Sequence, residues 1–84
     1  MKIRSNIALS ESGFIFNPNT GESFTLNPVG QELFGLLRDN KTEEEIKNIF
    51  LEKYDVEESI LEKDFDDFTH FLKNYQILEE DGQA

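Results

Sequence analysis

The segment 23–28, Ser-Phe-Thr-Leu-Asn-Pro, joins the pattern of a strand to the start of a helix. Phe24 and Leu26 alternate with polar residues, so both are expected on one face of an extended segment. Asn27 can accept hydrogen bonds from the free N–H groups of a helix start, and Pro28 suits the first helical position because no donor is needed there. The chain before this segment therefore predicts short strands, and the chain after it predicts helices.

Turn residues divide the first part of the chain into three expected strands, at residues 3–9, 14–16 and 22–26. The connection after the second strand is rich in Asn, Pro and Gly, and Gly21 is available there for a positive φ. The short spacing between the second and third strands predicts a β-hairpin.

Three helices are expected after the hairpin. The first spans about residues 28–37. The second opens at Thr42, which has the spacing of a capping box with the glutamate three residues later. The third starts at Asp55 or Glu57 and runs to about residue 75, after which Ile77 and Leu78 are expected to pack back onto the domain.

These elements in 84 residues predict one small α+β domain over residues 1–84. We expect a three-stranded antiparallel N-terminal sheet followed by three helices. The core would span about residues 3–78, with a polar tail at 79–84.

The net charge of −10 is concentrated in residues 41–84, which carry fourteen acidic and five basic residues. Such a surface repels the phosphates of nucleic acids and the headgroups of anionic membranes. We expect no nucleic-acid or membrane partner, and protein or peptide partners instead. The N-terminus lacks the apolar run of a signal peptide and no segment is long enough to span a membrane, which predicts a cytoplasmic location.

Residue types that carry catalysis or bind metals are scarce. The chain has no cysteine, and its single histidine, His70, is expected at the surface of the third helix. Asp64, Asp66 and Asp67 lack the turn-rich loop of a calcium site and are interpreted as a solvated helix face. We therefore expect no enzyme activity, no catalytic residue, no metal and no cofactor.

The third helix has more large apolar residues than one face can bury. Phe71 and Ile60 lie beside Asp64 and Asp67 on a line next to the core stripe, so part of the apolar surface should remain available to a partner. A groove between this helix and the last strand could accept an extended peptide. Four residues follow the helical period and are expected to face the core: Leu61, Phe65, Phe68 and Leu72.

Several short motifs occur in one order and spacing: Thr20-Gly21, Phe24-Thr25-Leu26-Asn27, Asp64, and the segment Phe68 to Leu72. In this arrangement, over about residues 5–78, the chain resembles the PqqD-like family, whose members are also called RiPP recognition elements. The run Leu26-Asn27-Pro28-x-Gly30 is similar to that of stand-alone members that accompany lasso-peptide maturation. One departure is Gln76, which stands where a glycine usually ends the third helix of the family.

The resemblance implies a winged helix-turn-helix fold that binds the leader region of a ribosomally synthesised precursor peptide. The leader would add as a strand between the third strand and the third helix, and would be presented to a modifying enzyme such as a radical-SAM protein or a leader peptidase. The implied peptide-binding residues are Glu22, Ser23, Phe24, Thr25, Leu26, Asp64, Phe65, Asp67, Phe68, Phe71 and Leu72.

Two other functions remain open at this point. The chain could be a structural or dimerisation module of a larger enzyme complex. A DNA-binding winged helix would have a similar fold, but the acidic third helix argues against it. The sequence does not distinguish pyrroloquinoline quinone assembly from a lasso-peptide or another peptide pathway.

Overall fold

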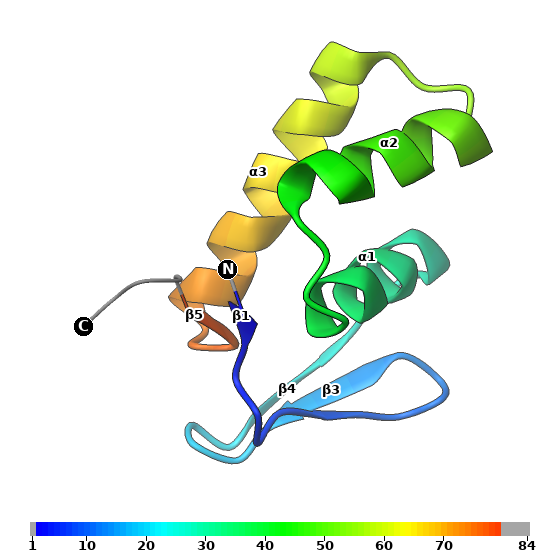
Figure 1. Cartoon of the computed structure of the whole chain (residues 1–84). Helices are drawn as coiled ribbons and strands as arrows, with labels where there is room; N and C mark the ends of the chain where they lie inside the picture. The colour runs from blue at the N-terminus through cyan, green and yellow to red at the C-terminus, as the bar shows by residue number, and fades with distance from the viewer. Residues whose placement is uncertain (1, 80–84) are drawn as a thin grey trace.

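The computed structural model describes residues 2–79, in which a small sheet is followed by three helices (Figure 1). The helices are α1 (Pro28–Arg38), α2 (Glu43–Lys53) and α3 (Glu58–Asn74). The strands are β1 (Lys2–Ile3), β2 (Ala8–Leu9), β3 (Phe14–Asn17), β4 (Glu22–Thr25) and β5 (Leu78–Glu79). The expected α+β class and winged helix-turn-helix arrangement are confirmed.

The strands form two sheets. One is a three-stranded antiparallel sheet in the order β2-β3-β4, and the other is a two-stranded antiparallel pair of β1 with β5. The expected three-stranded antiparallel sheet is confirmed, but the structure adds the β1–β5 pair, so the expected number of strands is wrong. Residues 3–9 do not form one strand, because a turn in which the Ile7 N–H donates to the Arg4 carbonyl (3.2 Å) redirects the chain. The Arg4 N–H then donates to the Ile77 carbonyl at 2.9 Å, which joins the N-terminal segment to the end of α3.

The helix starts follow the predicted caps. The Asn27 side chain accepts from the Gly30 N–H at 2.7 Å, and Pro28 occupies the first helical position of α1. At α2, the Thr42 hydroxyl accepts from the Glu45 N–H at 3.1 Å, while the Glu45 carboxylate accepts from the Thr42 N–H at 2.8 Å. Both arrangements satisfy N–H groups that have no partner within the helix, so local sequence defines where these helices begin.

The end of α3 is closed by two backbone bonds. The Gln76 N–H donates to the Lys73 carbonyl at 3.1 Å, and the Ile77 N–H donates to the Leu72 carbonyl at 2.8 Å. This is the Schellman pattern, which requires a left-handed residue, and Gln76 has φ +59°. Gln76 therefore adopts a conformation that glycine adopts at a lower energetic cost. The helix ends at the position where PqqD-like proteins usually have a glycine.

Because Gln76 adopts the left-handed region, Gln76→Gly is expected to raise the stability of the domain. Relief of the side-chain strain should add about 1 kcal/mol to the free energy of unfolding. For a domain of this size that corresponds to an increase in Tm of about 4–8 °C. Thermal unfolding followed by circular dichroism measures the change. Gln76→Ala keeps a side chain at this position and serves as the control, which should show no such gain.

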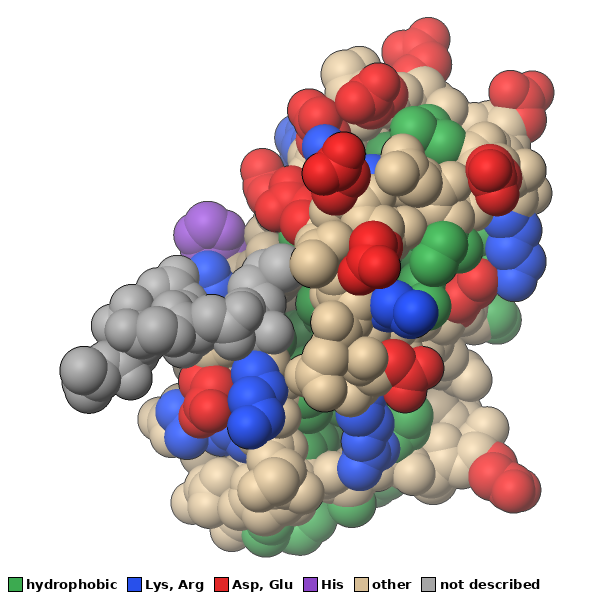
Figure 2. All heavy atoms as spheres, in the orientation of Figure 1, with side chains coloured by type: hydrophobic (Ala, Val, Ile, Leu, Met, Phe, Trp, Pro, Cys, Tyr) green, Lys and Arg blue, Asp and Glu red, His purple; other side chains and the backbone are tan. Residues whose placement is uncertain are grey.

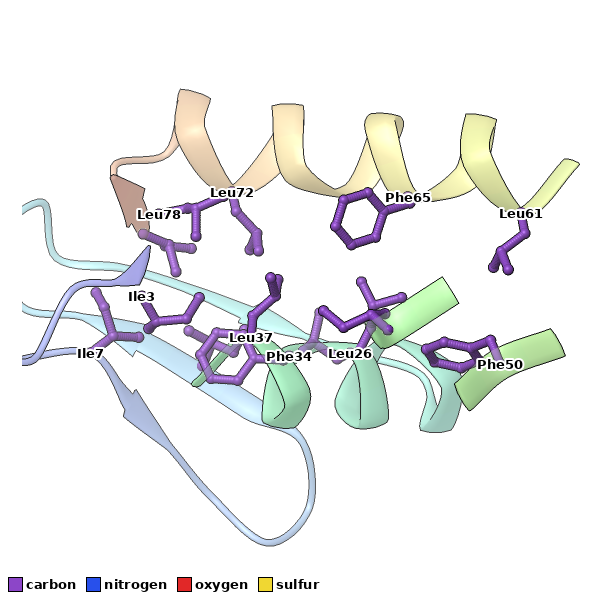
Figure 3. Packing of buried hydrophobic residues seen from close by; sticks show 14 residues of the cluster. Ile3, Ile7, Leu26, Phe34, Leu37, Phe50, Leu61, Phe65, Leu72 and Leu78 are labelled. Carbon is purple, nitrogen blue, oxygen red and sulfur yellow. The ribbon is translucent and has the colours of Figure 1, made fainter. Parts of the chain in front are cut away.

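The core lies between α3 on one side and the sheet with α1 on the other (Figure 3). Phe34 and Phe65 are almost fully buried, and Leu72 at the far end of α3 points toward Leu37 of α1. Phe68, which was expected in the core, is only half-buried. Ile77 and Leu78 are buried, as predicted, because β5 returns the chain to β1.

Acidic side chains gather over α2 and α3 on the face shown in Figure 2. Within residues 2–79, no helix has both the length and the apolar character that crossing a membrane requires. Of the expected polar tail, residues 80–84 lie outside the described residues. Glu79 belongs to β5 and is paired with Lys2.

Candidate functional site

A groove of about 570 Å³ opens where the end of β4 meets the three helices. Its wall on α3 is mostly apolar, and the first turn of α1 and the segment after α2 form the other sides. The residues that line it are Thr25, Leu26, Asn27, Val29, Gly30, Leu33, Phe50, Tyr54, Val56, Leu61, Asp64, Phe65, Asp67, Phe68 and Phe71.

Strand β4 is an edge of its sheet. It pairs with β3 on one side, and within residues 2–79 no strand pairs with its other side. The Leu26 N–H donates to the Gly13 carbonyl at 2.8 Å, so it points toward the β3 side. In an antiparallel pair this direction alternates along the strand, so the N–H and C=O groups of Ser23 and Thr25 point outward. An unpaired backbone edge therefore leads to Thr25 at the groove.

The edge and the helix face are held together by aromatic rings. The Phe24 ring contacts the Phe71 ring edge-on, with 5.2 Å between centroids, and the Tyr75 ring at 4.7 Å. Phe71 also packs against Tyr75 at 5.1 Å and lies 6.5 Å from Phe68. Aromatic rings prefer such edge-on and tilted arrangements to a face-to-face stack. These ring contacts join β4 to the last turns of α3, beside the groove.

Most of the site residues expected from the sequence lie together. Seven line the groove: Thr25, Leu26, Asp64, Phe65, Asp67, Phe68 and Phe71. Phe24 borders it through its contact with Phe71, and Glu22 and Ser23 lie farther along the β4 edge with exposed side chains. Leu72 does not reach the groove, because its side chain is 0% exposed and belongs to the core.

Sequence reasoning missed the side of the groove opposite α3. Val29 and Gly30 in the first turn of α1, and Tyr54 and Val56 after α2, all line the groove. Val29 is 50% exposed, which the sequence does not reveal, because its apolar side chain is equally typical of a core residue. Tyr54 ends α2 in an extended conformation, so helical periodicity does not place its side chain at the groove.

A buried asparagine fixes the hairpin against α3. Asn17, the last residue of β3, is 0% exposed, and its amide Nδ2 donates to the Tyr75 carbonyl at 2.9 Å and the Gln76 carbonyl at 3.4 Å. Its Oδ1 accepts from the Asn19 N–H at 2.9 Å. The side chain therefore satisfies carbonyls at the end of α3 and one N–H of the β3–β4 turn. This contact positions β4 relative to α3.

The charged residues in the lining are both acidic. Asp64 and Asp67 belong to α3, and no Lys or Arg of the described chain lines the groove. The Lys63 ammonium donates to Asp67 at 3.0 Å, and this hydrogen bond raises the pKa of Lys63. Asp64 makes no ion pair within residues 2–79. The groove therefore combines an apolar wall with negative charge along its rim.

A second charged cluster lies next to the groove and joins two helices. The Glu32 carboxylate accepts from the Lys53 ammonium at 2.8 Å and from the Tyr54 hydroxyl at 2.6 Å. Both hydrogen bonds lower the pKa of Glu32, and the one from Lys53 has the larger effect. A carboxyl with a lowered pKa stabilises the fold above its ordinary pKa, and this contribution is lost as the pH falls through the lowered value. The cluster holds Tyr54 at the groove over the neutral pH range.

The single histidine of the chain, His70, does not line the groove. His70 is exposed on α3, where its Nδ1 lies 3.3 Å from the Asp66 carbonyl of the same helix. Within residues 2–79, no three His, Cys, Asp or Glu side chains are grouped so that they could hold a metal ion. The arrangement of the groove is suited to holding an extended chain by backbone hydrogen bonds and apolar contacts.

One family model and one solved structure match this chain. The family model described as "Coenzyme PQQ synthesis protein D (PqqD)" matches residues 13–78. A solved structure described as "TbiB1 in Complex with the TbiA(beta) Leader Peptide" superposes with a TM-score of 0.88 at 30% sequence identity, covering 100% of this chain and 99% of that one. No curated protein matches the chain. The family match extends from the turn before β3 to β5, and the chain therefore belongs to the PqqD family.

Proposed function

We propose that this protein binds the leader region of a ribosomally synthesised precursor peptide. The leader adds as a strand to the free edge of β4, and its side chains on one face enter the groove against α3. The similar protein TbiB1, whose structure contains a leader peptide, supports this assignment. The observation that carries it is the juxtaposition of an unpaired strand edge with a groove of about 570 Å³.

The two components of the site have different tasks. Outward N–H and C=O groups of Ser23 and Thr25 bind any extended backbone, which gives register with little dependence on sequence. The apolar wall formed by Phe65, Phe68 and Phe71 selects large apolar side chains at alternate positions of the peptide. Affinity then comes from the backbone pairing, and specificity from the groove.

The protein acts without catalysis in this proposal. It holds the leader in an extended form and delivers it to a modifying enzyme, such as a radical-SAM protein or a leader peptidase, in the cytoplasm. The whole chain from residue 1 to 84 serves as the binding domain.

Fluorescence anisotropy tests leader binding directly. Fluorescein-labelled leader segments are synthesised from the short reading frames that neighbour the gene, with the TbiA(β) leader peptide as a further probe. We expect saturable binding by at least one neighbouring leader and none by a scrambled peptide of the same composition. Equal binding of the native and scrambled peptides would contradict recognition of a leader.

Delivery requires a separate experiment. Purified enzymes encoded beside the gene are assayed for modification of the precursor with and without the protein. Stimulation that is lost when free leader peptide is added in excess supports delivery. An equal rate in the presence and absence of the protein would reject it while leaving leader binding intact.

An edge strand could also pair with a second copy, which keeps the dimerisation module as an alternative. Light scattering after size exclusion distinguishes the two, since a leader-binding monomer keeps its β4 edge available. A DNA-binding role is disfavoured because α3 exposes Glu58, Glu62, Asp64, Asp66 and Asp67. A gel-shift titration at low salt tests that role.

Phe71→Ala is expected to reduce leader affinity more than stability. The ring is half-buried and lines the groove, so its loss should weaken binding about tenfold. Lost contacts with Phe24 and Tyr75 should reduce the free energy of unfolding by only about 1 kcal/mol. Calorimetric titration and thermal unfolding measure the two effects. Phe65→Ala is the contrasting variant, because its 1% exposed ring should cost about 3–5 kcal/mol of stability.

A further inference from the structure

Asp64 lies within the apolar stripe that α3 presents to the groove. It follows Leu61 by three residues and precedes Phe68 by four, and residues at these spacings lie on the same helix face. All three line the groove. Glu62, Asp64 and Asp66 are all exposed, but of these three only Asp64 lines the groove. Asp64 therefore differs from its neighbours in the surface that it faces.

No ion pair within residues 2–79 holds Asp64. Lys63, the neighbouring base, interacts with Asp64 through its charge but donates its hydrogen bond to Asp67 at 3.0 Å. No Lys or Arg within residues 2–79 lines the groove, and none forms an ion pair with Asp64. An apolar occupant would displace water from this carboxylate, and a desolvated carboxylate without a partner is costly. An occupant that brings a positive charge next to Asp64 offsets this cost most effectively.

The course of β4 sets where that charge should lie. Phe24 contacts Phe71 and Tyr75 near the end of α3, whereas Leu26 lies opposite Phe65 (Figure 3). The strand thus runs along α3 toward its N-terminus, and an added strand beside it runs along α3 as well. Asp64 and Phe68 are four residues apart, or about 6 Å along a helix axis. Alternate residues of a strand are separated by about 6.6 Å, which is a close match.

We propose that the groove is specific for an extended peptide with a Lys or Arg two residues from a large apolar side chain. The apolar side chain packs on Phe68 and Phe71, and the basic side chain pairs with Asp64. Asp67 adds negative potential at the same rim. This specificity rests on the proposed peptide-binding function and names the class of leader that the protein accepts.

A selection experiment tests this specificity even when the sequence of the leader is unknown. A random dodecapeptide library is displayed on its encoding messenger RNA and selected against immobilised wild-type protein. Lys or Arg is expected to be enriched two positions from Phe, Tyr, Leu or Ile. One selected peptide is then synthesised and titrated against Asp64→Lys and the matched control Asp66→Lys. Both variants change the charge of α3 equally, but only Asp64 lines the groove.

Asp64→Lys should weaken binding of the selected peptide about tenfold, and Asp66→Lys should change it less than twofold. Exchanging the basic residue of the peptide for Glu should restore affinity for Asp64→Lys. This rescue shows a direct pair, because a general charge effect would move both variants together. Circular dichroism verifies that each variant is folded.

The outcomes separate the two proposals. Enriched peptides without a basic preference, or equal effects of the two lysine variants, would overturn the requirement for a cation while leaving peptide binding in place. Selected peptides that bind Thr25→Pro as tightly as wild type would place the site away from β4 and overturn both. A selection that enriches no peptide would also reject both.

Discussion

Thr25→Pro is expected to weaken leader binding about 100-fold while the domain stays folded. Thr25 is the last residue of β4 and its N–H points away from β3, so proline removes a donor that the sheet does not use. The proline ring also obstructs an approaching strand. A loss of two or three backbone hydrogen bonds, each of about 1 kcal/mol net, accounts for the effect. Calorimetric titration of a leader peptide measures the change in Kd.

Thr25→Val is the matched control for this change. Valine retains the backbone N–H and the branched shape of threonine, so binding should remain within about threefold of wild type. Equal losses for proline and valine would assign the effect to the side chain instead of the strand edge. Unchanged affinity of a folded Thr25→Pro variant would contradict strand addition at β4. Circular dichroism and Tm report whether each variant is folded.

Asn17→Ala is expected to lower the free energy of unfolding by about 2–3 kcal/mol, since alanine leaves carbonyls at the end of α3 without their donor. The corresponding decrease in Tm is about 10–20 °C for a domain of this size. Loss of this contact also frees the hairpin from α3, so leader affinity should fall as β4 loses its position. Urea unfolding and calorimetric titration measure the two quantities.

Asn19→Ala is the control for Asn17→Ala. Asn19 lies in the same turn, but its side chain is exposed and bonds to the side chain of Asn6, at 2.9 Å and 3.4 Å. Its replacement should cost less than about 0.5 kcal/mol. Similar losses for both variants would indicate a general weakening of the turn and would contradict the specific role of Asn17.

The elements that were predictable are those with a local physical signal. Asn27 and Thr42 cap α1 and α2 through bonds that span only three residues, so a short window of sequence contains the whole interaction. Phe24 and Leu26 alternate with polar residues in the sequence. In the structure Phe24 is half-buried and Leu26 is buried, whereas Ser23 and Thr25 are exposed. The helical period placed Leu61, Phe65 and Leu72 in the core, where the structure has them.

The errors concern residues whose partners are distant in the chain. β1 pairs with β5, a contact between Ile3 and Leu78 that no local pattern indicates. Asn17 has the composition of a turn residue, but its burial depends on the end of α3, 58 residues later. Gln76 is a local case in contrast: it departs from the glycine of the family but adopts the same conformation, because the nearby Leu72 and Lys73 carbonyls accept the closing hydrogen bonds.

For the binding site, amino-acid order alone was enough to identify β4 and the apolar face of α3, since periodicity assigns residues to faces whatever elements pack beside them. It could not supply the opposite wall of the groove, formed by Val29, Tyr54 and Val56, nor show that Leu72 is enclosed. Those features arise only when separate elements pack together. The shape of the groove depends on the position of the hairpin, which Asn17 and the Phe24–Phe71 contact hold against α3. Packing also leaves the outer edge of β4 unpaired within residues 2–79, and that edge is the feature on which binding depends.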